Sequence, residues 1–366
     1  MSHWRSKELT IYLNDSCNMG CVYCYPGDYK ENVRVISKEF ALAGIDYFIK
    51  NKKGPTQLDR VRFYALGEPT LEMGLIKDLY YYAKSVAEED ISFELQSNGT
   101  FTNDDAEWIG NHIDTVWISL DGPPEIHDAQ RPLSSGGVSS DLILNNIKVI
   151  SHGISSIGMR PTITNLSIDR MAEILEFASS INVDALYFHP EIKAQGKNVR
   201  SDGVYNIGLV EFAIRYIEDI LPKLPIEGLF VGNFLTINFD EKTSIYCRSC
   251  LPCPQLTVDG YISACDKAPL GSDARFDSMI FGKWDAKNQL INLYQDKIDY
   301  LKSRKVENME PCKECAISKN CGGGCLGEMN FYKGDIFVVN KEYCEAIKLL
   351  ASNIPLNAGL YPHTHP

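Results

Sequence analysis

Strand-like and helix-like segments alternate six times between residue 9 and about residue 224. Neighbouring parallel strands need a crossover connection, which is usually helical, so this alternation predicts a parallel sheet. We therefore expect an α/β fold built as a partial (β/α)6 barrel, an open relative of the TIM barrel. The expected strands span residues 9–13, 60–66, 91–96, 115–120, 154–163 and 185–189, and the expected helices span residues 37–50, 71–87, 104–111, 139–150, 168–180 and 204–220.

Polar turns follow several of these strands at their carboxyl ends, where ligands bind in such sheets. Gly67-Glu68-Pro69 follows the second strand, Ser97-Asn98-Gly99-Thr100 the third, and Ser119-Leu120-Asp121-Gly122-Pro123 the fourth. Each turn alone is ordinary, because Gly, Pro and Asn often end strands. His189 ends the sixth strand and is either a substrate contact or a structural histidine. The three turns together predict a ligand site at one edge of the sheet.

The twelve cysteines are distributed unevenly, with three before residue 25, none from residue 25 to 246, and nine after that. Residues 1–16 are charged and lack the apolar stretch of a signal peptide, and no apolar run is long enough to span a membrane. We therefore expect a cytoplasmic protein with no membrane partner. Closely spaced thiols in a reducing compartment favour metal ligation over disulfides, so two metal-binding regions are expected. The formal net charge of −12 argues against a nucleic-acid partner.

The first group, Cys17, Cys21 and Cys24, has the spacing C-x3-C-x2-C and follows the first expected strand. A short loop with this spacing can bring each thiolate to a different iron of one [4Fe–4S] cube. The fourth iron then has no protein ligand, which points to catalysis. A zinc knuckle is the alternative, because thiolates alone do not distinguish iron from zinc.

This loop resembles that of the radical S-adenosylmethionine (radical SAM) enzymes, in which the open iron binds the amino and carboxylate groups of S-adenosylmethionine. Tyr23 matches the aromatic residue that the family places beside the adenine. The resemblance implies that Glu68 binds the methionine ammonium in the turn with Gly67, where Leu66 replaces the usual first glycine.

The same resemblance implies roles for residues after the third and fourth strands. Asn98 and Ser119 are candidates for the ribose or carboxylate, and Asn146 is a candidate for a further carboxylate contact. The segment Ile126–Arg131 resembles the family's loop after strand four. Within it, we expect His127 to stabilise the loop rather than to donate a proton.

The C-terminal cysteines resemble those of the SPASM extension of radical SAM enzymes that modify peptides, with the run C-x2-C-x5-C-x3-C at residues 312–325. The resemblance implies two auxiliary [4Fe–4S] clusters and three clusters in all. A pair of zinc ribbons is the alternative. The implied ligands are Cys312, Cys315, Cys321 and Cys344 for the outer cluster, and Cys247, Cys253, Cys265 and Cys325 for the inner one. Cys250 is assigned to no cluster. Whether it replaces Cys247 or Cys253 as a ligand is left undecided by this assignment.

The expected domains are a radical SAM partial barrel over residues 1–224, a bridging segment over residues 225–246, and a cysteine-rich, loop-rich SPASM domain over residues 247–366. The resemblance implies that a 5′-deoxyadenosyl radical removes a hydrogen atom from the substrate, which then loses an electron to an auxiliary cluster and a proton to a base. Asp266, directly after Cys265, is the candidate base. A solvated loop carboxylate, or a partner of a cluster sulfur, is the alternative role for Asp266.

We therefore expect an oxidoreductase that modifies a peptide or protein by crosslinking, dehydrogenation or formylglycine-type oxidation. Its partners would include an external electron donor such as a flavodoxin or ferredoxin. The first strand begins near residue 9, which leaves no room for an N-terminal leader-binding domain, so a separate leader-binding protein or unaided recognition is expected. The alternatives are a radical dehydrogenase acting on a small molecule and a non-catalytic electron-transfer or cluster-storage protein.

Overall fold

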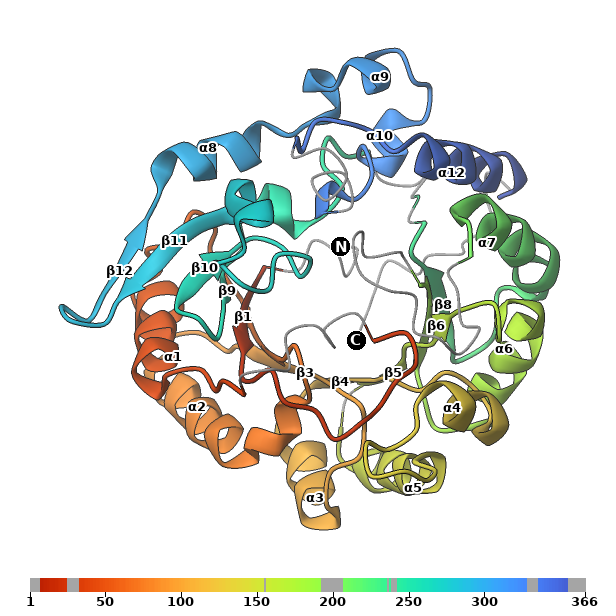
Figure 1. The fold of residues 1–366 in the computed structure, drawn as a ribbon, viewed down its shortest axis with the longest axis horizontal. Coiled ribbons are helices and arrows are strands. Elements are labelled where there is room, and N and C mark those ends of the chain that lie inside the picture. Colours follow the sequence, from red (N-terminus) through yellow and green to blue (C-terminus); the bar gives the residue numbers. More distant parts are fainter. Residues whose placement is uncertain are drawn as a thin grey trace. The chain divides into compact units, whose positions relative to one another are not determined.

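A computed structural model describes residues 7–24, 33–154, 156–191, 207–235, 237, 242–327 and 335–354 (Figure 1). The chain forms two compact units. The first unit comprises residues 1–16, 28–95 and 242–340, and the second comprises residues 17–27, 96–241 and 341–366. Among the described residues, no helix combines the length and apolar character needed to cross a membrane.

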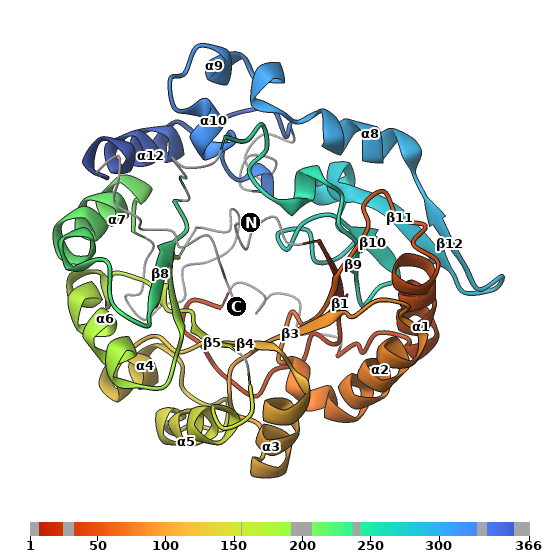
Figure 2. The same ribbon diagram turned by 180° about the vertical axis from the view of Figure 1, so that it is seen from behind.

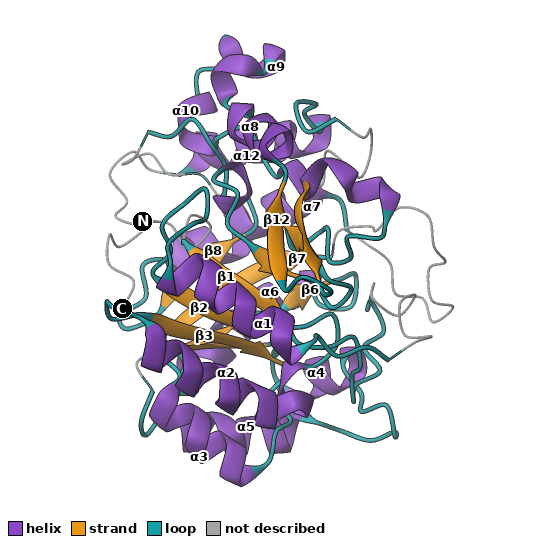
Figure 3. Cartoon of the chain, turned by 90° about the vertical axis from the view of Figure 1, so that its left-hand side faces the viewer, coloured by secondary structure: helices purple, strands orange, loops and turns teal. Residues whose placement is uncertain are grey.

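The first unit contains three of the expected parallel strands, β1 (Glu8–Tyr12), β2 (Arg60–Tyr64) and all but the last two residues of β3 (Ser92–Ser97). Glu8 pairs with Arg60, and Arg60 with Ser92, so the three strands start in register. Two helices, α1 (Lys38–Ile45) and α2 (Met73–Val86), lie beside these strands (Figures 1 and 3). Ser37 caps α1 by accepting a hydrogen bond from the Phe40 amide, as a serine before a helix often does.

The segment after Cys247 extends the sheet of the first unit. Strand β9 (Gln255–Leu256) pairs in parallel with β1, and β10 (Tyr261–Ser263), β11 (Ile280–Asp285) and β12 (Leu290–Leu293) follow as antiparallel neighbours (Figure 2). The region expected to be rich in loops therefore also contains four strands, which the sequence analysis did not anticipate. β9 and β10 contain only two and three residues, which is too short for an alternating pattern to be visible. The helices that follow are α8 (Gln295–Ser303), α9 (Glu310–Lys313) and α10 (Ser318–Cys321).

The second unit is built around four parallel strands and the helices that connect them (Figure 1). Helix α12 (Lys341–Asn353) packs against α7 (Leu209–Arg215), and its Glu342 carboxylate accepts from the Leu209 amide at the start of α7. The strands are β4 (Thr115–Ile118), β5 (Ser156–Met159), β7 (Ala185–Pro190) and β8 (Phe230–Asn233), with the short β6 (Thr162–Ile163) beside the end of β7. The helices are α3 (Asn103–His112), α4 (Pro124–Gln130), α5 (Ser140–Ile150), α6 (Met171–Ser180), α7 (Leu209–Arg215) and α12 (Lys341–Asn353).

The structure differs from the sequence-based elements at three places in the second unit. The expected strand 154–163 is divided into β5 and β6 around Pro161, which has no amide hydrogen for a ladder. The segment expected as a loop after strand four contains α4, which starts at Pro124, a favourable first helical residue. The expected bridging segment 225–246 contains β8. Of the expected helix 204–220, residues 204–206 lie outside the described residues.

Candidate functional site

The cysteine loop, residues 17–24, follows the carboxyl end of β1 and is braced by the segment after α4. The Gly20 amide donates to the Pro132 carbonyl at 2.8 Å, and the Val22 amide donates to the Gln130 carbonyl at 2.9 Å. Met19 forms a further antiparallel bridge with Leu133. The backbone that carries the three thiols is therefore held at several points.

The three thiols of this loop influence one another electrostatically. Burial raises the pKa of the Cys21 thiol to about 11; the Arg131 guanidinium opposes this rise, and Cys24 and Cys17 add to it. Among the described residues, no three His, Cys, Asp or Glu side chains are close enough to ligate a single metal ion. A [4Fe–4S] cube takes one thiolate per iron, so its ligands lie farther apart than those of one ion. Three soft donors on a braced loop beside a cation fit such a cluster.

Tyr23 is fixed by two charged residues from the loop and helix after β4. Its hydroxyl donates to the Asp121 carboxylate at 2.7 Å, and the Arg131 guanidinium lies over its ring at 5.1 Å. Arg131 in turn donates from Nε to Asp121 at 3.0 Å. Sequence reasoning singled out Tyr23 but assigned no role to Asp121 or Arg131, although both stand in the motifs that carried the resemblance.

The Gly67-Glu68 turn is bonded to the residues that directly precede Cys17. The Glu68 amide donates to the Ser16 carbonyl at 2.7 Å, and the Asn14 side chain donates to the Glu68 carbonyl at 2.9 Å. A Cβ atom at Gly67 would lie 1.7 Å from the Ser16 carbonyl oxygen, so only glycine fits there. The buried Glu68 carboxylate accepts from the amide and hydroxyl of Thr70.

Asn98 lies against the cysteine loop. Its side-chain amide donates to Asn18 at 2.9 Å, and its side-chain carbonyl accepts from the Thr100 amide at 2.9 Å. Ser119 follows β4 and is partly exposed. The structure thus brings Asn98 directly to the loop that carries Cys17, Cys21 and Cys24.

Asn146 supports the loop after β3 rather than the cysteine loop. Its side-chain amide donates to the carbonyls of Gly99 and Phe101, both at 2.8 Å. At the carboxyl end of β7, the His189 ring lies 5.0 Å from the Phe234 ring, and its Nδ1 is 2.8 Å from the Pro190 carbonyl.

His127 is fully buried and bonded on both ring nitrogens. The Asp121 amide donates to Nδ1 at 3.2 Å, which assigns the ring hydrogen to Nε2, 3.0 Å from the Ser139 hydroxyl. Burial lowers the pKa of His127 to about 4. These contacts support the expected loop-stabilising role, because a neutral ring fits both partners.

We expect His127 to make the protein less stable as the pH falls from about 6.5 to about 4. The unfolded chain takes up a proton on this ring near its usual pKa of 6.5, whereas the folded protein does so only near 4, so acid favours unfolding. The loss amounts to about 3 kcal/mol of unfolding free energy. Chemical denaturation of the wild-type protein and His127→Gln across this range would measure it. An equal pH dependence in both proteins would contradict this expectation.

All twelve cysteines lie among the described residues, and none of them forms a disulfide bond. Burial raises the pKa of Cys265 well above its usual value, and the neighbouring Cys325 and Cys247 raise it further. Burial also raises the pKa of Cys253 to about 12, with Cys247 again among the neighbours. Cys247 is likewise among the neighbours of Cys250, so the choice of Cys253 over Cys250 for the inner cluster stays a prediction.

The other C-terminal thiols are placed as follows. Burial raises the pKa of Cys321, and Cys315 lies near enough to add to the effect. Cys312 is buried on α9, and Cys344 lies on α12 of the second unit. Burial raises the pKa of Cys250 to about 11, an effect opposed by the fully buried Arg304.

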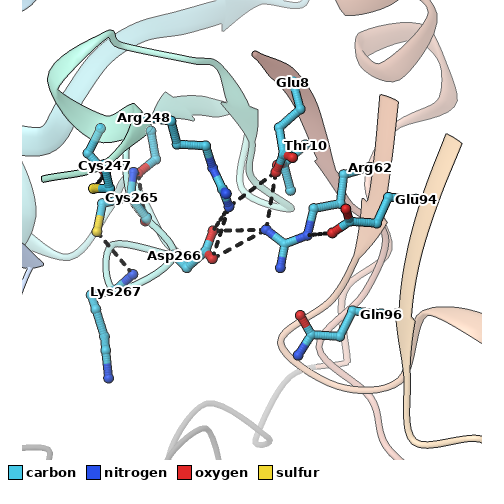
Figure 4. A network of polar contacts seen from close by, with 12 residues as sticks. Glu8, Thr10, Arg62, Glu94, Gln96, Cys247, Arg248, Cys265, Asp266 and Lys267 are labelled. Atoms are coloured by element: carbon cyan, nitrogen blue, oxygen red, sulfur yellow. Dashed lines mark hydrogen bonds and ion pairs between the residues drawn. The ribbon is translucent and has the colours of Figure 1, made fainter. Parts of the chain in front are cut away.

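Asp266 belongs to a network of buried charges in the first unit (Figure 4). Its carboxylate lies 3.2 Å from both Arg62 of β2 and Arg248, the residue after Cys247. Arg62 and Arg248 also contact Glu8 of β1 at 3.5 and 3.1 Å. The Asp266 side chain is 28% exposed, whereas those of Arg62 and Glu8 are 3% and 0% exposed. The network therefore contains one partly exposed carboxylate, and it belongs to the residue that follows Cys265.

Nearby carboxylates keep the arginines of this network charged. Burial alone would lower the pKa of Arg62, but Asp266, Glu8 and Glu94 together raise it well above its usual value. Burial and the Glu8 charge raise the pKa of Glu94. Sequence reasoning missed this network. The available signal is the presence of charged residues inside strands that are otherwise apolar.

Comparison with known proteins identifies the first half of the chain. Residues 11–178 match the model of the radical SAM superfamily. The radical SAM cyclopropyl synthase TigE of Paramaledivibacter caminithermalis is 22% identical, over 94% of this chain and 73% of that protein. The cysteine-type anaerobic sulfatase-maturating enzyme of Clostridium novyi is also 22% identical, over 93% of this chain and 94% of that protein.

The fold also matches that of a protein of known structure. The structure of native anSMEcpe with bound AdoMet and Cp18Cys peptide matches with a TM-score of 0.70 at 18% identity, covering 94% of this chain and 96% of that one. This match confirms the expected α/β class with a TIM-like partial barrel and a cysteine-rich C-terminal region. Together with the thiol spacing and the sequence relatives, these findings show that the chain contains a radical SAM domain at residues 11–178.

Proposed function

We propose that this enzyme oxidises a side chain or α-carbon of a peptide or protein, using SPASM-type auxiliary clusters. The observation that carries the proposal is the position of Asp266. Asp266 directly follows Cys265 in the chain. Its carboxylate is partly exposed and forms ion pairs with two arginines. Relatives named as a cyclopropyl synthase and a sulfatase-maturating enzyme support a substrate of this class.

The thiols of the chain divide into three ligand sets under this proposal. Cys17, Cys21 and Cys24 hold the cluster of the radical SAM domain. Cys247, Cys253, Cys265 and Cys325 hold the inner auxiliary cluster, and Cys312, Cys315, Cys321 and Cys344 hold the outer one. When bound, the first cluster supplies one electron to S-adenosylmethionine, and the auxiliary clusters accept the electron that the substrate loses.

The remaining roles fall to side chains that bind the cosubstrate and move a proton. Glu68, Asn98 and Ser119 orient S-adenosylmethionine next to the cysteine loop, where the Asn98–Asn18 hydrogen bond already places an amide. The substrate loses one hydrogen atom to the deoxyadenosyl radical and then one electron and one proton. Asp266 takes that proton, which completes a two-electron oxidation. Reducing equivalents come from a flavodoxin or ferredoxin, and a separate leader-binding protein delivers the peptide where the core motif does not suffice.

Anaerobic incubation with reductant, S-adenosylmethionine and a set of peptides would test the proposal. The set should contain sulfatase-derived Cys and Ser motifs and any short peptide encoded beside the gene. We expect deoxyadenosine together with a peptide that has lost two hydrogen atoms or gained an aldehyde, measured by mass spectrometry. Deoxyadenosine without a mass change in any peptide, but with oxidation of an added small molecule, would favour the radical dehydrogenase instead.

A further inference from the structure

Arg131 connects the cysteine loop to a buried carboxylate. Its Nη1 lies 3.9 Å from the sulfur of Cys21, and its guanidinium lies 5.1 Å from the centre of the Tyr23 ring. Its Nε donates to Asp121 at 3.0 Å. Arg131 is 9% exposed and Asp121 is fully buried, so water does not screen these charges strongly.

The guanidinium is held in one orientation. Arg131 also donates from Nη2 to the Thr162 hydroxyl at 3.3 Å. Asp121 accepts further hydrogen bonds from the Gln130 side chain at 3.0 Å and from the Thr162 amide at 2.9 Å. The carboxylate that anchors Arg131 is therefore itself anchored by neighbouring elements of the second unit.

The two charges act on Cys21 with opposite sign. The positive charge of Arg131 lies 3.9 Å from the Cys21 sulfur, and the negative charge of Asp121 lies 3.0 Å from Nε of the same guanidinium. A cation that favours the thiolate also favours an added electron on a metal cluster bound to that sulfur. Hydrogen bonds to ligand sulfurs and the local charge are known to set the reduction potentials of iron–sulfur clusters.

We propose that Arg131 is a positioning residue that raises the reduction potential of the cluster carried by Cys17, Cys21 and Cys24, and that Asp121 holds it against Cys21 while partly offsetting its charge. The higher reduction potential makes it easier for an external donor to reduce this cluster. It depends on the radical SAM domain alone and is independent of which substrate the enzyme modifies.

A redox titration followed by electron paramagnetic resonance would test this inference on the full-length protein. The signal that changes when S-adenosylmethionine is added identifies the cluster of the cysteine loop among the three. We expect Arg131→Gln to retain its iron and to shift the midpoint potential of this signal to a more negative value. Asp121→Asn should shift it in the opposite direction, because the asparagine oxygen can still accept the hydrogen bond from Arg131 while the negative charge is removed. Arg131→Lys keeps the positive charge but lacks the planar guanidinium. Its midpoint potential should lie between those of the wild type and Arg131→Gln.

Arg170→Gln is the matched control, since Arg170 pairs with Glu125 and Glu173 on the surface of the same unit. Its potential should equal that of the wild type. A purely structural defect would shift Arg131→Gln and Asp121→Asn in the same direction and would overturn the proposal. Unchanged potentials in both variants, or loss of iron from both and from Arg131→Lys, would overturn it as well.

Discussion

Replacement of Cys21 by alanine is expected to abolish deoxyadenosine formation. Under the proposed assignment Cys21 is the middle ligand of the braced loop, and without it two irons of the cube, instead of one, have no protein ligand. The two proposed auxiliary clusters use other thiols, so iron content should fall by about one third rather than to zero. Iron and sulfide analysis of anaerobically purified protein, with chromatography of deoxyadenosine, would measure both effects.

Cys250→Ala is the matched control, because Cys250 is buried but is assigned to no ligand set. This variant should keep the wild-type iron content and the wild-type rate of deoxyadenosine formation. Undiminished deoxyadenosine formation by Cys21→Ala would contradict the assignment of the cysteine loop. Loss of iron from Cys250→Ala would instead move Cys250 into the inner ligand set.

Asp266→Asn is expected to separate deoxyadenosine formation from product formation. The cysteine loop is unchanged in this variant, so cleavage of S-adenosylmethionine should continue. Product should fall by about 10²–10⁴-fold, the usual contribution of a general base. Asparagine nearly matches the shape of aspartate, but its amide cannot take the proton and leaves Arg62 and Arg248 with one carboxylate fewer. The ratio of product to deoxyadenosine, measured by mass spectrometry in single reactions, is the decisive quantity.

Asp285→Asn provides a control with the same chemical change at the partly exposed end of β11, where the carboxylate accepts from the amides of Lys287 and Asn288. Its ratio of product to deoxyadenosine should equal that of the wild type. Asp266→Glu should recover part of the product, because a carboxylate is restored. An unchanged ratio in Asp266→Asn would exclude Asp266 as the base and leave it as a partner of the two arginines.

The strands at the centre of the barrel are predictable from sequence because each is followed by a helix of recognisable length. β8 and β9 are not predictable in this way, since they are short and their partners are set by packing rather than by a local pattern. The glycine at residue 67 is predictable as a turn, but the reason for it, the close approach of Ser16, appears only in the structure.

In the candidate site, too, local features are predictable from the sequence, whereas contacts between distant residues are not. Spacing alone brings Cys17, Cys21 and Cys24 together, because they share one short loop. The contact between Arg62 and Asp266 joins residues that are 204 positions apart, so no local pattern reports it. Arg131 stands 110 positions from Cys21, and only the folded chain reveals that its charge lies beside that sulfur.

The pairing of β9 with β1 has a consequence for any attempt to study the halves of the chain separately. A fragment ending before Cys247 would expose the hydrogen-bonding groups along one side of its first strand. Unpaired strand edges can pair with strands of other chains, so such a fragment would be prone to self-association. The cysteine-rich segment thus covers the edge of β1 in addition to supplying thiols.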